Sequence, residues 1–352
     1  MPGTADQIIA QLDAERRTVA FDAYDIIVRQ LMAMISSSEI DIAPDYQRQF
    51  VWGEERESEL IESILLGIPV PSLYMAVNAA DGVWEVVDGV QRLSTILHFY
   101  GDAEHLRRVD RPQPLRLTGL EKLSHLNGIT YADLPGVVRT GFQNRSLRVT
   151  TLNDRSDVNV RFDLFERLNT GGVGLHAQEI RNIVYRGSFK QTIRQLSTDG
   201  TFRSVLKLSR GSRDLDTSAE YEEAVLRFFA LLNNYQGFQH LVKAFLNDYM
   251  AEHANQPPAP DQLALFNETF GFIAAELPRG ITRGREQTPI NLYEAIAVGT
   301  ALAIRARGVN GLQRGVLSGL LLEEPLKRLT GAGSNSRAMV AGRIEYVLNR
   351  LI

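Results

Sequence analysis

The five residues from Asp88 to Arg92 (DGVQR) have the types and the spacing of a phosphate-binding turn. They follow an apolar run over residues 83–87 with the length and composition of a strand, and they precede a helical pattern over residues 91–100. A strand, a glycine turn and a helix N-terminus together point backbone N–H groups at an anion, and the glycine lets the anion approach. We therefore expect an anion site at this turn.

Two side chains of the turn can add to such a site. Arg92 lies in the first helical turn, where its guanidinium can hold phosphate oxygens in a bidentate way. Asp88 can hold a divalent cation or orient a water, although one carboxylate makes only part of a cation site. The same residues also fit a tight turn with an acid at its start and a solvent-facing arginine, and the pattern alone leaves both interpretations open.

A second group of polar and aromatic residues lies upstream, in a stretch with the composition of a loop. Tyr46, Gln47 and Arg48 are followed by Phe50 and Trp52. An arginine beside aromatic rings can bind phosphate and stack on nucleobases. Phe50 and Trp52 can equally fix the loop to the core.

A third group follows a helical pattern that begins near Asp157 and ends in a glycine-rich stretch (FERLNTGG). Adjacent glycines permit a left-handed backbone and an exposed nest of N–H groups. The next helix begins near His176 and carries the run QEIRN, in which Glu179, Arg181 and Asn182 can reach the same ligand. The alternative is a helix–glycine–helix corner with a local Glu–Arg pair.

Periodicity predicts the elements that must position these groups. Residues 22–37 and 54–66 have apolar positions at helical spacing, and Gly67 can end the second helix. Short strands are expected at 40–42, 73–77, 83–87, 115–117 and 147–152, whereas the sequence after His176 is helical almost throughout. The prolines of residues 254–260 (ANQPPAP) indicate a linker between helices. This order predicts an α+β N-terminal part with a small mixed sheet and a mostly α-helical C-terminal part.

Composition excludes several kinds of chemistry and location. The chain of 352 residues has no cysteine, which excludes disulfides, thiol nucleophiles, zinc ribbons and iron–sulfur clusters. The first 20 residues lack a signal-peptide pattern, and no apolar run reaches the roughly 18 residues of a membrane span. We therefore expect a cytoplasmic protein that makes no use of a membrane.

The net charge of −4 conceals an uneven distribution. Residues 1–134 carry 11 basic and 21 acidic side chains, whereas residues 135–213 carry 14 basic and 6 acidic ones, a net charge of +8. A basic segment attracts phosphate even in an acidic chain, so we expect DNA to contact Arg139, Arg145 and Arg148. The alternative is a solvated face on which these arginines pair with nearby carboxylates.

Taken in order, the motifs resemble one bacterial family. The segments are PDYQRQFVW, ESELIESILLGIPVPSLYM, VWEVVDGVQRLSTIL, FERLNTGG and QEIRN, and the resemblance covers roughly residues 22–205. The family is catalogued as domain of unknown function 262, and its members are ParB/sulfiredoxin-like modules. They form the N-terminal part of modification-dependent restriction enzymes of the GmrSD type and of related proteins in phosphorothioate-linked phage defence.

The resemblance implies a site and a chemistry. The family's central motif, Asp-Gly-Gln-Gln-Arg, is associated with nucleotide binding and hydrolysis, and Mg²⁺ is expected with the nucleotide, at Asp88. This sequence departs from the motif at Val90, which removes an amide and puts hydrolysis in doubt while binding can survive. The implied catalytic residues are Asp88, Gln91 and Arg92. The nucleotide-binding set comprises Gly89, Gln91, Arg92, Ser94, Thr95, Tyr46, Gln47, Arg48, Arg167, Asn169, Gly171, Gly172, Glu179, Arg181 and Asn182.

Restriction members of the family also carry an HNH nuclease domain, which needs clustered histidine and asparagine side chains around a metal. After residue 205 this sequence has only His240 and His253, both in a helical context. We therefore expect a separate nuclease or toxin partner to supply any cleavage.

We interpret residues 1–205 as a ParB/sulfiredoxin-like domain that interacts with nucleotide and DNA, and residues 206–352 as a helical domain. The favoured function is a nucleotide-dependent sensor or regulator in bacterial restriction or anti-phage defence, an NTPase if it hydrolyses, which engages modified or foreign DNA. One alternative is a non-enzymatic DNA-binding module or antitoxin-like partner. The other is a ParB-like nuclease that uses Asp88 and Glu85, but residues three apart on a regular strand face opposite sides.

Overall fold

The computed structural model describes residues 4–15, 21–42, 52–77, 81–152, 162, 165–167, 176–208, 218–284, 287–331, 333 and 335–352. The chain divides into two compact units, residues 1–175 and residues 176–352. This division falls earlier than the boundary at residue 205 expected from the sequence. The reason is that helix α8 (Ala177–Val184) packs on α11 (Ser218–Asn234) and α12 (Val242–His253), which belong to the second unit.

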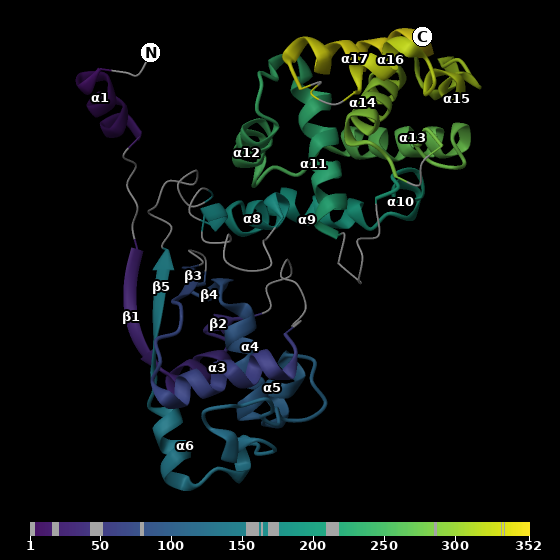
Figure 1. Ribbon diagram of the computed structural model, residues 1–352. Helices are drawn as coiled ribbons and strands as arrows, with labels where there is room; N and C mark the ends of the chain where they lie inside the picture. The colour runs from purple at the N-terminus through teal and green to yellow at the C-terminus, as the bar shows by residue number, and fades with distance from the viewer. Residues whose placement is uncertain are drawn as a thin grey trace. The chain divides into compact units, whose positions relative to one another are not determined.

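The described residues of the first unit form a five-stranded mixed sheet, preceded in the chain by helix α1 (Ala5–Glu15) (Figure 1). The strand order is β1-β5-β3-β4-β2. The β1–β5 and β3–β4 pairs are antiparallel, and the β5–β3 and β4–β2 pairs are parallel. The predicted mixed sheet is thereby confirmed, and its strands are β1 (Phe21–Ile27), β2 (Ile40–Asp41), β3 (Leu73–Val77), β4 (Trp84–Asp88) and β5 (Ser146–Leu152).

The helix predicted over residues 22–37 is wrong in its first half. Residues 21–27 form β1, which pairs along its whole length with β5, from Phe21 opposite Leu152 to Ile27 opposite Ser146. Only α2 (Val28–Ser36) is helical, and its buried residues have the spacing of one helix face: Val28, Leu31, Met32 and Ile35. The helical periodicity came from residues 28–36. Residues 21–27 form a strand because their backbone pairs with the distant strand β5.

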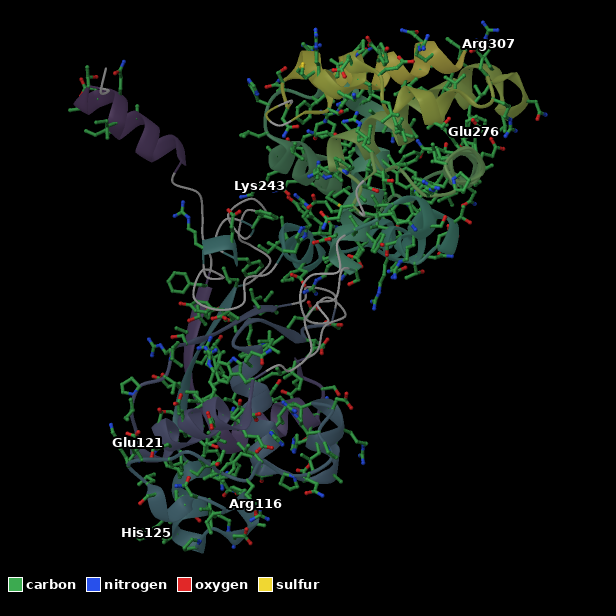
Figure 2. The ribbon with its side chains drawn as sticks, turned by 45° about the vertical axis from the view of Figure 1, so that its right-hand side comes forward. Arg116, Glu121, His125, Lys243, Glu276 and Arg307 are labelled. Atoms are coloured by element: carbon green, nitrogen blue, oxygen red, sulfur yellow. The ribbon has the colours of Figure 1, made fainter. Side chains whose placement is uncertain are left out.

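Helices α3 (Glu54–Leu66) and α4 (Val90–Tyr100) pack on one another and contribute to the core of the first unit, together with α6 (Gly136–Gln143). Gly67 ends α3 with a left-handed φ of 74°, as expected from the sequence. Between α5 (Ala103–Arg108) and α6, the described residues 115–117 form no strand, contrary to the prediction. Leu117 instead exchanges backbone hydrogen bonds with Gly128 and Ile129. Arg116, which is labelled in Figure 2, donates to the carbonyl oxygen of Gly128.

The described residues of the second unit are mainly helical, which confirms the predicted α-helical C-terminal part. Helix α14 (Ile290–Arg307) is central: it packs on α11, α13 (Pro260–Glu276) and α17 (Arg337–Leu351). The proline-rich segment 254–260 forms the turn between α12 and α13, and Pro260 is the first residue of α13. The remaining helices are α9 (Ser188–Ser197), α10 (Gly200–Val205), α15 (Val316–Leu320) and α16 (Glu324–Leu329). No helix in the described parts of the chain is long and apolar enough to cross a membrane.

Candidate functional site

The turn at Gly89 joins the end of a central strand to the start of a helix. Asp88 is the last residue of β4 and pairs with Tyr74 on β3, and α4 begins immediately after Gly89. Gly89 has a φ of 104°, and a Cβ atom there would lie 2.4 Å from Leu73 Cδ2. Both the backbone conformation and the close approach therefore require glycine, so the predicted strand–glycine–helix turn is present.

Arg92 ties this turn to the loop that leads into β3. Its Nη1 donates to the carbonyl oxygens of Pro71 (2.5 Å) and Ser72 (3.0 Å), and its Nη2 donates to Asp88 Oδ2 (2.6 Å). The Arg92 side chain is 12% exposed and that of Asp88 is 41% exposed. The structure thus brings together two of the three predicted catalytic side chains, as an ion pair one helical turn apart.

Gln91, the third of these side chains, connects the turn to the second predicted group. Its Oε1 accepts a hydrogen bond from the backbone N–H of Trp52 (3.2 Å), the first described residue after the segment 43–51. Arg56 stacks on the indole of Trp52, with its Cζ 4.4 Å from the ring centroid. Trp52 is therefore held at the base of α4. The other predicted ligands of this loop, Tyr46, Gln47 and Arg48, lie outside the described residues.

The polar residues further along α4 face the interior. Thr95 is completely buried and donates its hydroxyl to the backbone carbonyl of Gln91 (2.8 Å), and Ser94 is 4% exposed. Val90, where the family motif has glutamine, is half-buried and packs against the hydrophobic core. The assignment of Ser94 and Thr95 to a nucleotide stays a prediction.

A buried charged cluster next to the turn was missed by the sequence reasoning. His98 Nδ1 lies 2.6 Å from Glu57 Oε2 on α3, and His98 Nε2 lies 3.0 Å from the carbonyl oxygen of Gln113. Arg111 Nη2 lies 3.6 Å from Glu57 Oε1 and donates to the carbonyl of Trp52 (3.1 Å). The cluster thus reaches Gln91 through the backbone of Trp52. A signal existed in the sequence, since His98 interrupts an apolar helix and a buried histidine needs a polar partner.

The QEIRN run lies in the second unit, where its side chains have partners within that unit. Arg181, 1% exposed, donates to Asn247 Oδ1 (2.9 Å) and to Glu223 Oε2 (3.0 Å). Asn182 donates to Glu222, and the Glu179 carboxylate accepts from the backbone N–H of His176 in a capping box. These contacts hold α8 against α11 and α12. Nucleotide contact by Glu179, Arg181 and Asn182 stays a prediction.

The charge around Arg181 is balanced by a buried carboxylate. Burial raises the pKa of Glu223, but Arg227 and Arg181 outweigh it and lower this pKa to about 2. Arg227 in turn bonds Glu294 on α14 (2.7 Å), which also accepts from Arg343 on α17. This series of alternating charges links four helices of the second unit.

The FERLNTGG stretch is described only in part. Phe165 of this stretch and Phe162 just before it are each 1% exposed, and Arg167 is exposed. The predicted ligands Asn169, Gly171 and Gly172 lie outside the described residues.

Comparison with known families identifies the first part of the chain. Residues 28–185, somewhat less than half of the chain, match a family described as the N-terminal domain of the GmrSD restriction endonuclease. The match begins at α2, includes the turn at Gly89 and ends just after α8. This region is similar to the N-terminal domain of the GmrSD restriction endonuclease. Comparisons with curated proteins and with solved structures gave no match.

The three arginines predicted to contact DNA occupy different positions in the matched region. Arg145 donates to the carbonyl of Leu65 (2.8 Å) at the C-terminus of α3, and its guanidinium covers Gly67. Arg148, 53% exposed, forms a cross-strand pair with Asp25 on β1 (2.9 Å). Arg139 is half-buried on α6. Arg148 is therefore exposed and paired with a carboxylate on the neighbouring strand, whereas Arg145 bonds a backbone carbonyl at the end of a helix.

The described residues of the chain contain no group of three or more His, Cys, Asp or Glu side chains that could hold a metal ion. Glu85, the partner that a nuclease site at Asp88 would need, lies on β4 three residues before it. The β3–β4 register shifts between Tyr74 and Met75, so that Ala76 lies opposite Glu85 and Tyr74 opposite Asp88, and the opposite facing expected for a regular strand does not hold here.

Proposed function

We propose that the chain is a nucleotide-dependent component of a bacterial restriction or anti-phage defence system that engages DNA in the cytoplasm. The observation that carries the proposal is the position of the turn at Gly89. It lies inside the match to the N-terminal domain of a restriction endonuclease, and it combines a strand end, a helix N-terminus and the Asp88–Arg92 pair. The ParB/sulfiredoxin-like relationship of the sheet is part of the same proposal.

The first turn of α4 would supply the phosphate contacts. The first N–H groups of a helix have no partner within it, and the helix dipole favours an anion there. The N-cap residue Gly89 has no side chain with which to cap these groups. Arg92 donates three of its five N–H groups to Pro71, Ser72 and Asp88, which leaves two donors for a phosphate oxygen.

Asp88 is suited to a Mg²⁺ ion that enters with the nucleotide. Its Oδ2 bonds Arg92 and its side chain is 41% exposed, so the second carboxylate oxygen can serve as a single ligand. Mg²⁺ commonly takes one or two carboxylates and completes its octahedral shell with water and substrate phosphates. A dedicated cluster of acids is therefore not needed.

Nucleotide binding without turnover is the second candidate function. Val90 favours it, because the side chain at this position packs against the core and carries no polar group for a water. The protein would then be a DNA-binding module or antitoxin-like partner that responds to nucleotide, with cleavage supplied by a separate nuclease or toxin.

The nucleotide site is tested by Arg92→Ala with Arg108→Ala as the matched control. Arg108 pairs with Glu104 one turn earlier in α5, as Arg92 pairs with Asp88, but it lies away from the turn. We expect Arg92→Ala to weaken triphosphate binding about tenfold to a hundredfold, through loss of a charge-assisted contact worth roughly 1.5–3 kcal/mol. Arg108→Ala should bind as wild type does in the same calorimetric titration. Equal binding by all three proteins would refute the assignment.

A further inference from the structure

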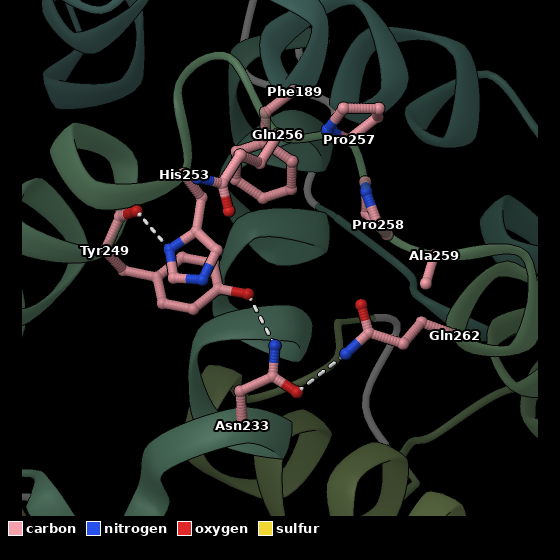
Figure 3. Close-up of a pocket in the computed structure, with 9 residues that line it drawn as sticks. All are labelled: Phe189, Asn233, Tyr249, His253, Gln256, Pro257, Pro258, Ala259 and Gln262. Atoms are coloured by element: carbon pink, nitrogen blue, oxygen red, sulfur yellow. Dashed lines mark hydrogen bonds between the residues drawn. The ribbon is translucent and has the colours of Figure 1, made fainter.

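The proline-rich turn at 254–259 forms one wall of a pocket within the second unit (Figure 3). The pocket has a volume of about 250 Å³, and its lining comes from α9, α11, α12, this turn and the start of α13. Two backbone hydrogen bonds fix the wall: Phe189 N–H donates to the Ala254 carbonyl (3.1 Å), and Gln256 N–H donates to the His253 carbonyl (2.8 Å). The pocket is therefore built into the helical fold.

Aromatic rings form another side of the pocket. The rings of Tyr249 and His253 stack with their centroids 4.0 Å apart and an interplanar angle of 19°, and Phe189 packs against both. Figure 3 shows the three rings grouped beside the turn that contains Pro257 and Pro258. Flat aromatic and proline surfaces offer apolar contact to a planar ligand.

A chain of hydrogen bonds lies beside these rings. Gln262 Nε2 donates to Asn233 Oδ1 (3.0 Å), and Asn233 Nδ2 donates to the Tyr249 hydroxyl oxygen (2.6 Å). Because the Tyr249 hydroxyl oxygen accepts this hydrogen bond, the hydroxyl can still donate its own proton to another acceptor. Burial raises the pKa of Tyr249 to about 12, so that proton is retained at neutral pH.

His253 and Gln262 supply the complementary acceptors. His253 Nδ1 lies 3.0 Å from the carbonyl oxygen of Tyr249, which can only accept, so the neutral ring carries its proton on Nδ1 and its lone pair on Nε2. Gln262 uses its amide nitrogen on Asn233, which leaves its carbonyl oxygen. The pocket thus offers a hydroxyl donor and two acceptors next to stacked rings.

The lining selects against a charged ligand. Of the described residues that line the pocket, none is Asp, Glu, Lys or Arg. The volume lies just below the roughly 300–1,000 Å³ typical of pockets for drug-sized ligands, so the occupant is smaller.

We propose that this pocket binds an uncharged, planar heteroaromatic ring of nucleobase size, stacked beside Tyr249 and His253 and hydrogen-bonded to the Tyr249 hydroxyl and the Gln262 amide. Such a ring has both donor and acceptor groups at its edge and a flat face for stacking. It can come from a free nucleoside or from an unpaired base of single-stranded DNA. The inference is independent of the phosphate site at Gly89, because the pocket lies within the other unit.

The test titrates the full-length protein with the four deoxynucleosides, and separately with a short oligothymidylate, in a calorimeter. Nucleosides carry no phosphate, so their binding reports on the pocket even if no triphosphate binds at Gly89. Tyr249→Phe keeps the ring and removes the hydroxyl, and Gln262→Ala removes the amide. Each should lower the affinity about threefold to tenfold, as expected for one neutral hydrogen bond.

Tyr235→Phe is the matched control, because the Tyr235 hydroxyl bonds Glu345 (3.3 Å) and the residue does not line the pocket. This variant should bind as wild type does. If nucleosides bind and both Tyr249→Phe and Gln262→Ala weaken this binding, the ligand is a free nucleoside. If only the oligonucleotide binds, and both variants weaken this binding, the ligand is a base within a DNA strand. The proposal is overturned if neither probe binds at about 1 mM, or if both pocket variants bind as wild type does.

Discussion

Glu57 on α3 and His98 on α4 lie 2.6 Å apart, and their side chains are only 0% and 5% exposed. The second ring nitrogen of His98 faces a carbonyl oxygen and must carry a proton. One further proton therefore lies between His98 Nδ1 and Glu57 Oε2, on one side or the other. Such a pair fixes α3 against α4 beside the turn at Gly89, because neither group can find water if its partner is removed.

We expect Glu57→Ala to lower the free energy of unfolding by roughly 3–5 kcal/mol, because it leaves His98 and Arg111 without their buried carboxylate. Urea denaturation followed by circular dichroism measures the change. Glu59→Ala on the exposed face of α3 is the control and should change stability by no more than about 0.5 kcal/mol. Similar losses in both variants would contradict the role of the pair.

Gly89→Ala should destabilise the protein more than Gly82→Ala. Both glycines have a positive φ, 104° and 75°, so both substitutions carry the conformational cost of about 1–2 kcal/mol. A Cβ at Gly82 meets nothing within 4 Å, whereas one at Gly89 meets Leu73 at 2.4 Å. The difference between the two variants should therefore be about 1–3 kcal/mol, the usual cost of overpacking. Equal denaturation midpoints would show that the β4–α4 turn can shift without cost.

Val90→Gln should raise nucleotide hydrolysis if the amide of the family motif positions the attacking water. Release of inorganic phosphate from ATP and GTP measures this effect. Because Val90 packs against the core, the variant should also lose about 1 kcal/mol of stability, and Val90→Thr controls for that loss without restoring the amide. Unchanged turnover with intact binding would show that the departure at Val90 is neutral.

The salt dependence of DNA binding should distinguish Arg148 from Arg145. If Arg148 contacts a phosphate, Arg148→Ala should flatten the slope of log affinity against log salt concentration by about 0.9 on duplex DNA. Arg145→Ala should instead lower stability by about 1 kcal/mol, because its guanidinium satisfies the C-terminal carbonyl of Leu65.

Fluorescence anisotropy across salt concentrations measures both slopes. Arg108→Ala, which removes a half-buried arginine from the acidic part of the chain, should leave the slope unchanged. If the wild-type protein has no affinity for duplex DNA at low salt, the proposed DNA binding is wrong.

Protonation of Glu223 at low pH should destabilise the second unit. Its pKa is lowered from 4.5 to about 2, so its contribution is complete above pH 4.5 and is lost as the pH falls toward 2. A difference of this size corresponds to about 3 kcal/mol. Denaturation between pH 7 and pH 2 should therefore give a falling free energy of unfolding that Glu223→Gln makes less steep. Glu220→Gln, exposed on the same helix, should follow the wild-type curve.

The sequence alone determined the elements whose signals are local. Residues 54–66 carry a helical period and end at Gly67, and residues 73–77 and 83–87 are short, mainly apolar runs with turn residues between and after them. The turn at Gly89 was predicted for the same reason, since a glycine between a strand and a helix needs only neighbouring residues to be recognised. The family match then agreed with the motifs found along residues 28–185.

Only the tertiary structure decided which partners the polar residues of these elements have. The sequence predicted a helix that begins at residue 22, but pairing with β5 makes residues 21–27 a strand. The sequence suggested that Arg92 faces solvent or binds phosphate. In the structure its guanidinium donates to three oxygens, one on Asp88 of β4 and two in the loop before β3. Arg181 was grouped with the nucleotide turn, yet its partners Glu223 and Asn247 lie in the second unit. Hydrogen bonds and ion pairs between residues far apart in the chain leave no periodic trace in sequence, because each depends on where two separate elements pack.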